Sequence, residues 1–190
     1  MVLSPSLIDG SLTRETLVNW IGSWRNASYG VVAITPSNWH KKIWESLGAT
    51  TVDASNILEE MGKLKQGQFP TPIVMAAKYD GVDLPDNMCR ILVIDSLPIT
   101  ETITEKYIEC CIPNSTFTQI KTAQTIEQGL GRAVRGEKDY CVIMLLGNDL
   151  VKQIRYKGSR QYLSPQTRKQ IDIGLDLAMY AREDMDDSKN

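Results

Sequence analysis

The chain has 190 residues, and its 21 basic and 23 acidic side chains leave a formal net charge of −2, which excludes a strongly cationic nucleic-acid-binding tail. With 42% apolar and 23% charged residues, the composition also excludes a disordered or fibrous chain. The longest apolar run, Cys141 to Leu146, is far shorter than the about twenty residues of a membrane helix, and the first residues lack the basic segment and apolar block typical of a signal peptide. We expect a soluble, cytoplasmic protein with no membrane partner.

The first part of the chain alternates helical spacing with short apolar runs. Apolar residues at helical spacing predict a helix over 13–24, and the β-branched run 31–35 after Gly30 predicts a buried strand. Pro36-Ser-Asn offers a turn and a cap for a second helix, and a short strand follows at 50–52. The apolar residues of the second helix are expected to share one inward face: Trp39, Ile43, Trp44 and Leu47.

The middle of the chain repeats this alternation. Ser55 is the expected cap of a third helix, and buried strands are predicted at 73–77 and 91–94. Residues 99–116 remain ambiguous between helix and loop. The third helix is expected to turn these residues inward: Leu58, Met61 and Leu64.

The last part contains a helix that begins near Phe117, a strand at 140–146 and a C-terminal helix. Ser164 and Pro165 are the expected cap and first residue of that helix, and its acidic end, 183–190, is expected to fray. A basic cluster in the preceding loop could contact a nucleic-acid backbone, but we interpret it as solvated: Lys152, Arg155, Lys157 and Arg160. The cysteines, none in a CxxC pair, are interpreted as reduced core thiols without a metal site: Cys89, Cys110, Cys111 and Cys141.

Strands that are apolar throughout and separated by helices are typical of a parallel sheet covered on both faces. The predicted fold class is therefore doubly wound α/β, with a mostly parallel sheet. In such sheets ligands bind beyond the carboxyl ends of the strands, which are the loops that begin near Thr35, Lys78, Asp95 and Gly147.

The segment Gln128-Gly-Leu-Gly-Arg-Ala-Val-Arg135 is the most informative part of the sequence. If the helix from Phe117 continues through it, Gln128, Gly131, Arg132 and Arg135 fall within an arc of about 100°, opposite the apolar residues. Paired guanidinium groups grip phosphate oxygens, so one interpretation is a clamp on a γ-phosphate. The alternative is a solvated helix face, although each interior glycine would cost that helix about 1 kcal/mol.

A second segment, Asp80-Gly-Val-Asp-Leu-Pro85, directly follows a predicted strand. Gly81 would allow a close backbone contact, and the Asp83 carboxylate would accept hydrogen bonds from a sugar hydroxyl. By itself the segment is a weak signal, and a plain turn is the better interpretation.

Together, DGVDLP at 80–85 and QGLGRAVR at 128–135 resemble motifs V and VI of superfamily 2 helicases, most closely the DinG-like branch. That branch has an E-G-[IV]-D-[FL]-P loop followed by Q-x-x-G-R-x-x-R. The resemblance covers about residues 30–147, and Asp80 departs from the usual glutamate. It implies a second RecA-like motor domain over 30–163, preceded by a helical lead-in over 1–29 and followed by a C-terminal helix and acidic tail over 164–190.

The resemblance also implies roles for individual residues. Arg132 would be the arginine finger, supported by Arg135, with Gln128 near the same phosphate or its attacking water. Three residues would contact the nucleotide: Gly81, Asp83 and Gly131. Three at the motif IV strand would meet the nucleic-acid backbone, expected to be single-stranded or duplex DNA: Thr35, Ser37 and Lys41.

The family keeps its GxxxxGK[ST] phosphate loop and its acidic Mg²⁺-binding box in the first motor domain, and this sequence contains neither. We therefore expect ATP with Mg²⁺ as cofactor, a separate N-terminal RecA-like domain as partner, and no ATP hydrolysis by this chain alone. A non-catalytic RecA-like module that binds nucleic acid or a partner remains the alternative. A flavodoxin-like or Rossmann enzyme is disfavoured because no glycine-rich turn follows the strand at 31–35.

Overall fold

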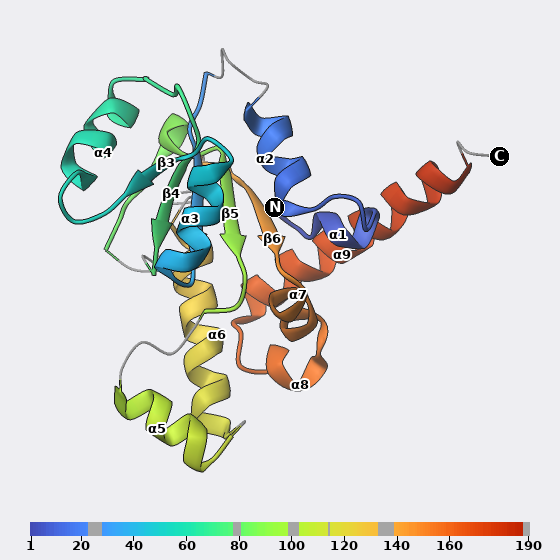
Figure 1. The fold of residues 1–190 in the computed structure, drawn as a ribbon. Helices are drawn as coiled ribbons and strands as arrows, with labels where there is room; N and C mark the ends of the chain where they lie inside the picture. The colour runs from blue at the N-terminus through green and yellow to red at the C-terminus, as the bar shows by residue number, and fades with distance from the viewer. Residues whose placement is uncertain (23–27, 78–80, 99–102, 114, 133–138, 188–190) are drawn as a thin grey trace.

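The computed structural model describes residues 1–22, 28–77, 81–98, 103–113, 115–132 and 139–187. Within them the strands form one parallel sheet in the order β1-β6-β5-β2-β4-β3 (Figure 1). The strands are β1 (Val2–Leu3), β2 (Val31–Thr35), β3 (Thr50–Val52), β4 (Ile73–Ala76), β5 (Ile91–Asp95) and β6 (Val142–Leu146).

Helices connect and cover the strands. They are α1 (Pro5–Ile8), α2 (Arg14–Gly22), α3 (Asn38–Ser46), α4 (Ile57–Lys65), α5 (Ile103–Cys111), α6 (Thr116–Leu130), α7 (Asn148–Arg155), α8 (Lys157–Arg160) and α9 (Pro165–Asp187), with a short 3₁₀ turn at Asp86–Met88. Among the described residues, no helix combines the length and apolar character that crossing a bilayer requires.

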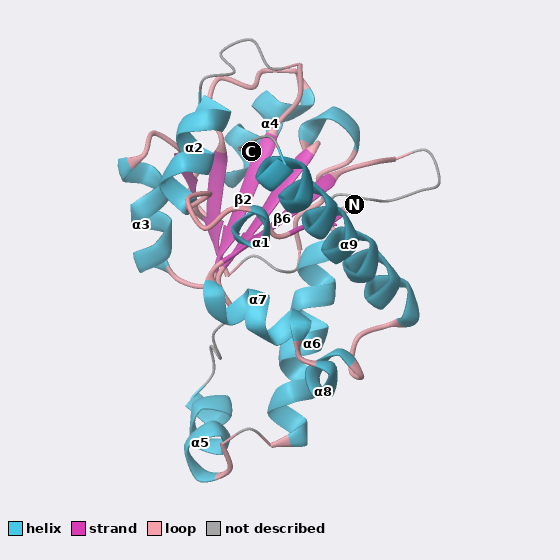
Figure 2. Cartoon of the chain, turned by 90° about the vertical axis from the view of Figure 1, so that its right-hand side faces the viewer, coloured by secondary structure: helices cyan, strands magenta, loops and turns pink. Residues whose placement is uncertain are grey.

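The two faces of the sheet bury separate apolar clusters, because successive side chains of a strand point to opposite faces. From β2, Val31 and Ala33 join a cluster with Trp44 of α3 and residues of α2. Val32 and Ile34 join the larger cluster, which contains residues of α4, α6, α7 and α9. Figure 2 shows α2 and α3 on one side of the sheet and α9 on the other. The predicted doubly wound α/β class is thereby confirmed, and every pairing described is parallel.

The first strand, β1, was not predicted, because two residues make no detectable pattern. Val2 and Leu3 pair with Ile143 and Met144 of β6, so the N-terminus extends the sheet at its edge. Helix α9 packs directly on this strand: a Cβ at Gly174 would lie 1.7 Å from the Val2 carbonyl oxygen. Glycine therefore allows the close approach of helix and strand. The expected division of the chain at residues 29 and 163 stays a prediction.

Several expectations about side chains were wrong because helical spacing does not say which face meets the sheet. Trp39 and Leu58, predicted to be inward, are 67% and 89% exposed.

Other expectations concerned the cysteines and the end of the chain. All four cysteines were expected in the core, but Cys110 and Cys111 are exposed on α5, whereas Cys89 and Cys141 are buried as free thiols. The basic cluster 152–160 lies on α7 and α8 rather than in a loop, and α9 continues through the acidic segment to Asp187.

Candidate functional site

The carboxyl ends of the central strands β4, β2, β5 and β6 form one edge of the sheet, and the chain turns sharply there. Ala77 and Ser96, which follow β4 and β5, have left-handed φ values of 52° and 74°, and Gly147 after β6 has φ 89°. The Ala77 N–H donates to the Thr35 carbonyl at 2.7 Å, and the Ser96 N–H donates to the Leu146 carbonyl at 2.9 Å. Such backbone strain in non-glycine residues concentrates at functional sites.

The segment with the arginines begins in α6 but leaves it earlier than expected. Ser115 caps α6, and the helix ends at Leu130, with Gly131 at its C-cap. Ala123, Ile126 and Leu130 are buried as predicted. Arg132 therefore lies in the turn beyond the helix and not on its surface stripe. Gly131 is not inside the helix, so it does not lower the stability of the helix as an interior glycine would. Arg135 lies outside the described residues.

Arg132 contacts the loop that follows β4. Its Nη1 donates to the Val82 carbonyl oxygen at 3.3 Å, joining positions 50 residues apart in the sequence. Val82 and Leu84 are buried, which fixes the loop, whereas Gly81 and Asp83 beside them are exposed. The two segments with predicted site residues are thus neighbours, and the Arg132 charge lies against the loop that contains Asp83.

The other predicted nucleotide contacts lie near the junction, which is our name for the contact between Arg132 and the loop around Val82. Gly81 has φ 80°, a left-handed conformation that favours glycine, and the space where its Cβ would lie is open. Gln128 is exposed on the last turn of α6. Asp80, the departure from the family pattern, lies outside the described residues.

The predicted nucleic-acid contacts lie at the start of α3. The buried Thr35 hydroxyl donates to the carbonyls of Ser37 and Met75, at 3.2 and 3.4 Å, so this side chain holds the turn in place. The Ser37 hydroxyl caps α3 and hydrogen-bonds the His40 Nδ1 at 2.9 Å. Lys41 is half-buried.

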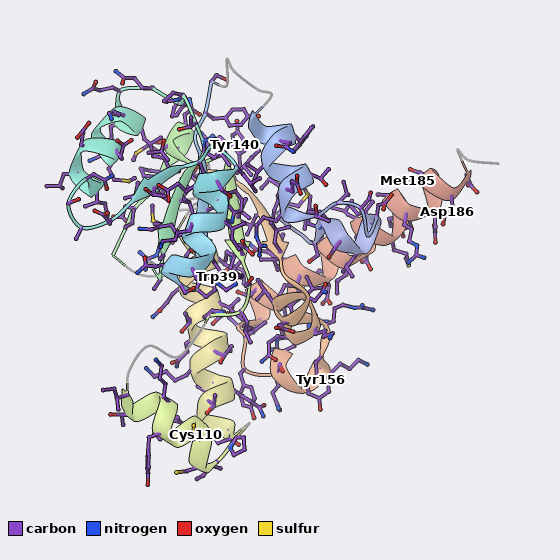
Figure 3. All side chains as sticks on the ribbon, viewed as in Figure 1. Trp39, Cys110, Tyr140, Tyr156, Met185 and Asp186 are labelled. Carbon is purple, nitrogen blue, oxygen red and sulfur yellow. The ribbon has the colours of Figure 1, made fainter. Side chains whose placement is uncertain are left out.

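Trp39 also belongs to this surface, although sequence reasoning assigned it to the core. Its ring is 67% exposed and packs edge-on against His40, with the ring centroids 4.8 Å apart. Figure 3 labels it at the lower end of α3. An exposed indole is suited to stacking with a nucleic-acid base.

Asp95, at the carboxyl end of β5, is a second residue whose importance the sequence did not indicate. Its fully buried carboxylate accepts from Arg14 Nε and Nη2 at 2.5 and 2.7 Å, from Trp44 Nε1 at 2.6 Å and from the Ser96 hydroxyl at 3.0 Å. Burial alone would raise the pKa of Asp95, but the hydrogen bonds from Arg14 and Trp44 and the Arg14 charge hold it below its ordinary value. The N-terminal segment is thereby tied to the carboxyl edge of the sheet.

Comparison with known proteins identifies the class of this domain. The model of the helicase C-terminal domain family matches residues 27–163, most of the chain, so the chain belongs to that family. Its parallel, doubly wound sheet is the RecA-like fold of a helicase motor domain.

Two solved structures illustrate the similarity. S. tokodaii Xpd4 is 20% identical, with a TM-score of 0.45 over 80% of this chain and 32% of that chain. The C-terminal part of the Fun30 ATPase domain is 13% identical, with a TM-score of 0.43 over 90% of this chain and 52% of that chain. The chain thus spans about a third and about half of these two chains. No curated protein matches it.

Proposed function

We propose that the chain is the second motor domain of an ATP-dependent DNA helicase or translocase of the DinG-like branch of superfamily 2. The observation that supports this most directly is the hydrogen bond from Arg132 to Val82, because it places the arginine of one motif against the loop of the other. In this proposal ATP lies between this domain and a preceding RecA-like domain.

The residues at the junction fit a phosphate-bearing nucleotide. Arg132 would reach the γ-phosphate and Arg135 would support it, since planar guanidinium groups match phosphate oxygens and offset the charge that develops in phosphoryl transfer. Gln128 would orient the attacking water, while Gly81, Asp83 and Gly131 would contact the nucleotide. Bound ATP with Mg²⁺ supplies the phosphoryl group.

The proposal assigns Mg²⁺ binding to the preceding domain. The part of the chain that the structure describes contains no group of three or more His, Cys, Asp or Glu side chains placed to hold a metal ion. The GxxxxGK[ST] loop and the acidic box that would do so are also absent from the sequence. We therefore expect this chain by itself to hydrolyse no ATP.

The nucleic-acid strand would pass the beginning of α3. Ser37 and Lys41 would contact its backbone, and the exposed Trp39 ring would stack on a base. Thr35 would act through the turn that its hydroxyl holds. The second candidate, a non-catalytic RecA-like binding module, is favoured if the encoding reading frame has no upstream GxxxxGK[ST] and acidic box.

The test is Arg132→Ala in a protein that contains both motor domains. We expect DNA-stimulated ATP turnover to fall by a factor of about 10³ to 10⁵, while ATP binding survives, because an arginine finger acts mainly in the transition state. Arg132→Lys keeps the charge but not the planar fork and should rescue little. Arg182→Ala, at an exposed arginine on α9, is the matched control. Near-normal turnover of Arg132→Ala would overturn the assignment.

A further inference from the structure

Positive charge gathers where α7, α8 and the beginning of α9 meet. Between Asn148 and Asp172 the sequence has six lysines and arginines and two aspartates, although the chain as a whole carries −2. We call these six residues the basic corner: Lys152, Arg155, Lys157, Arg160, Arg168 and Lys169. The corner is not part of the site described above, and its α9 residues lie beyond the matched range 27–163.

Within the described part of the chain, most of these charges have no ion-pair partner. Arg160 pairs with Asp172 and also donates to the Arg168 carbonyl at 3.4 Å. The other five side chains form no ion pair with any residue that the structure describes. Glu127, the nearby carboxylate of α6, accepts from the Ser164 backbone N–H at 2.6 Å. Concentrated charge of one sign creates a potential that attracts anionic ligands to this surface.

The direction of α9 adds to the positive potential. A helix has partial positive charge at its N-terminus, so acidic residues near the start and basic residues near the end are stabilising. Helix α9 has largely the opposite arrangement: its first turn has no acidic residue, Arg168 and Lys169 follow at once, and four of its six acidic residues lie between positions 183 and 187. This arrangement costs stability in the free protein and favours an anion at the beginning of the helix.

The surface at the corner is hollowed in two places. One hollow of 430 Å³ is lined by residues that include Lys157, Arg160, Arg168 and Lys169. A second hollow of 670 Å³ is lined by Leu97 and by Lys152, Arg155 and Tyr156. Leu97 follows β5 in the chain, so the second hollow reaches the carboxyl edge of the sheet.

An aromatic ring lies among these cations. Tyr156 joins α7 to α8 and is 67% exposed, and it appears beside α8 in Figure 3. Nucleic-acid bases stack on exposed aromatic side chains that lie next to cations binding the backbone. The ring therefore favours a nucleic-acid strand over a lone phosphate or an acidic peptide as the ligand.

We propose that the basic corner binds the phosphate backbone of a nucleic-acid strand, with Tyr156 stacking on a base. The strand extends from the carboxyl edge, past Leu97 and across α7, to the start of α9. The inference rests on the proposed function only in taking nucleic acid as the ligand. The basic corner would be a second contact region for the strand, on α7, α8 and α9, in addition to the one proposed at the start of α3.

The experiment measures binding of a fluorescein-labelled oligodeoxythymidine to the chain by fluorescence anisotropy, between 50 mM and 200 mM salt. The test variant combines Lys157→Gln, Arg168→Gln and Lys169→Gln, and leaves the Arg160 ion pair intact. The control variant combines Lys65→Gln, Lys106→Gln and Arg182→Gln, which removes the same charge from exposed positions elsewhere. Each lost phosphate contact lowers the slope of log K against log salt by about 0.7 for a single strand, so we expect a loss of about 2 in the test variant only.

Two further measurements identify the ligand. Tyr156→Ala should weaken oligonucleotide binding about tenfold without changing the salt slope, since stacking releases no counterions. Polyglutamate of matched charge should compete poorly with the labelled oligonucleotide. If polyglutamate competes as well as unlabelled oligonucleotide and Tyr156→Ala has no effect, the corner binds acidic proteins and the inference fails. It also fails if the chain shows no binding at 50 mM salt, or if test and control variants behave alike.

These outcomes are separable from failure of the proposed function. Equal salt slopes in both triple variants, together with loss of turnover in Arg132→Ala, overturn the inference alone. A reduced slope in the test variant, together with normal turnover in Arg132→Ala, overturns the role of Arg132 alone.

Discussion

Replacing Arg14 by alanine removes the only cation that the structure places on the buried Asp95 carboxylate, within the described residues. Asp95 would keep its hydrogen bonds from Trp44 and Ser96 but would hold an uncompensated charge. Breaking a buried ion pair from one side costs about 3–5 kcal/mol. Because 27% of the Arg14 side chain is exposed, water would partly solvate the carboxylate in the variant. We therefore expect a loss of about 2–3 kcal/mol in the free energy of unfolding.

The assay is urea denaturation at pH 7, followed by circular dichroism and tryptophan fluorescence. The midpoint should fall while the m-value stays unchanged, and the melting temperature should fall by about 5–10 °C for a chain of this size. Adding Asp95→Asn to Arg14→Ala should recover part of the loss, because it removes the orphaned charge. Arg182→Ala, at an exposed arginine on the same chain, should change stability by less than about 0.5 kcal/mol. An equally small effect of Arg14→Ala would falsify the assigned role of the ion pair.

The remaining predictions concern pH and the packing of α9. Because the pKa of Asp95 is lower in the folded than in the unfolded chain, its stabilisation is present above the unfolded value of about 3.9 and is lost as pH falls through the folded pKa. Urea titrations should therefore show a steeper acid loss of stability in the native chain than in Asp95→Asn; equal pH profiles would contradict this. Gly174→Ala should destabilise by about 1–3 kcal/mol, because its Cβ meets the Val2 carbonyl, despite the better helix propensity of alanine. Gly62→Ala, with nothing within 4 Å of its Cβ, should instead be neutral or stabilising by up to about 1 kcal/mol in the same denaturation experiment.

The strand predictions succeeded where strands are buried on both faces. Residues 31–35 correspond to β2 without any shift, and the runs at 50–52, 73–77 and 91–94 correspond to β3, β4 and β5 within a residue at either end. A central parallel strand must be apolar at every position, and this requirement is visible in the sequence alone. The edge strand β1 carries no such signal, because two residues become a strand only by pairing with β6.

Predictions about exposure succeeded less often, because helical periodicity defines a face but not its direction. Trp39 and Trp44 were assigned to one inward face, yet Trp44 is buried against Asp95 while Trp39 is 67% exposed. The arginine segment shows a related limit, because the spacing of residues does not say where a helix ends. The motif residues were recognised from their order in the sequence, but α6 ends at Leu130, so Arg132 lies in a turn and not on a helical stripe.

The sequence by itself determined the fold class, because strands buried on both faces must be apolar throughout. It also indicated the family, because the motif residues at 80–85 and 128–135 are local patterns that can be recognised in their order along the chain. Only the tertiary structure decided which distant residues meet: Arg132 with Val82, and Arg14 with Asp95. It also showed that α7, α8 and α9 concentrate the basic residues at one corner. These contacts depend on how strands and helices pack in three dimensions, and no local periodicity or spacing encodes that arrangement.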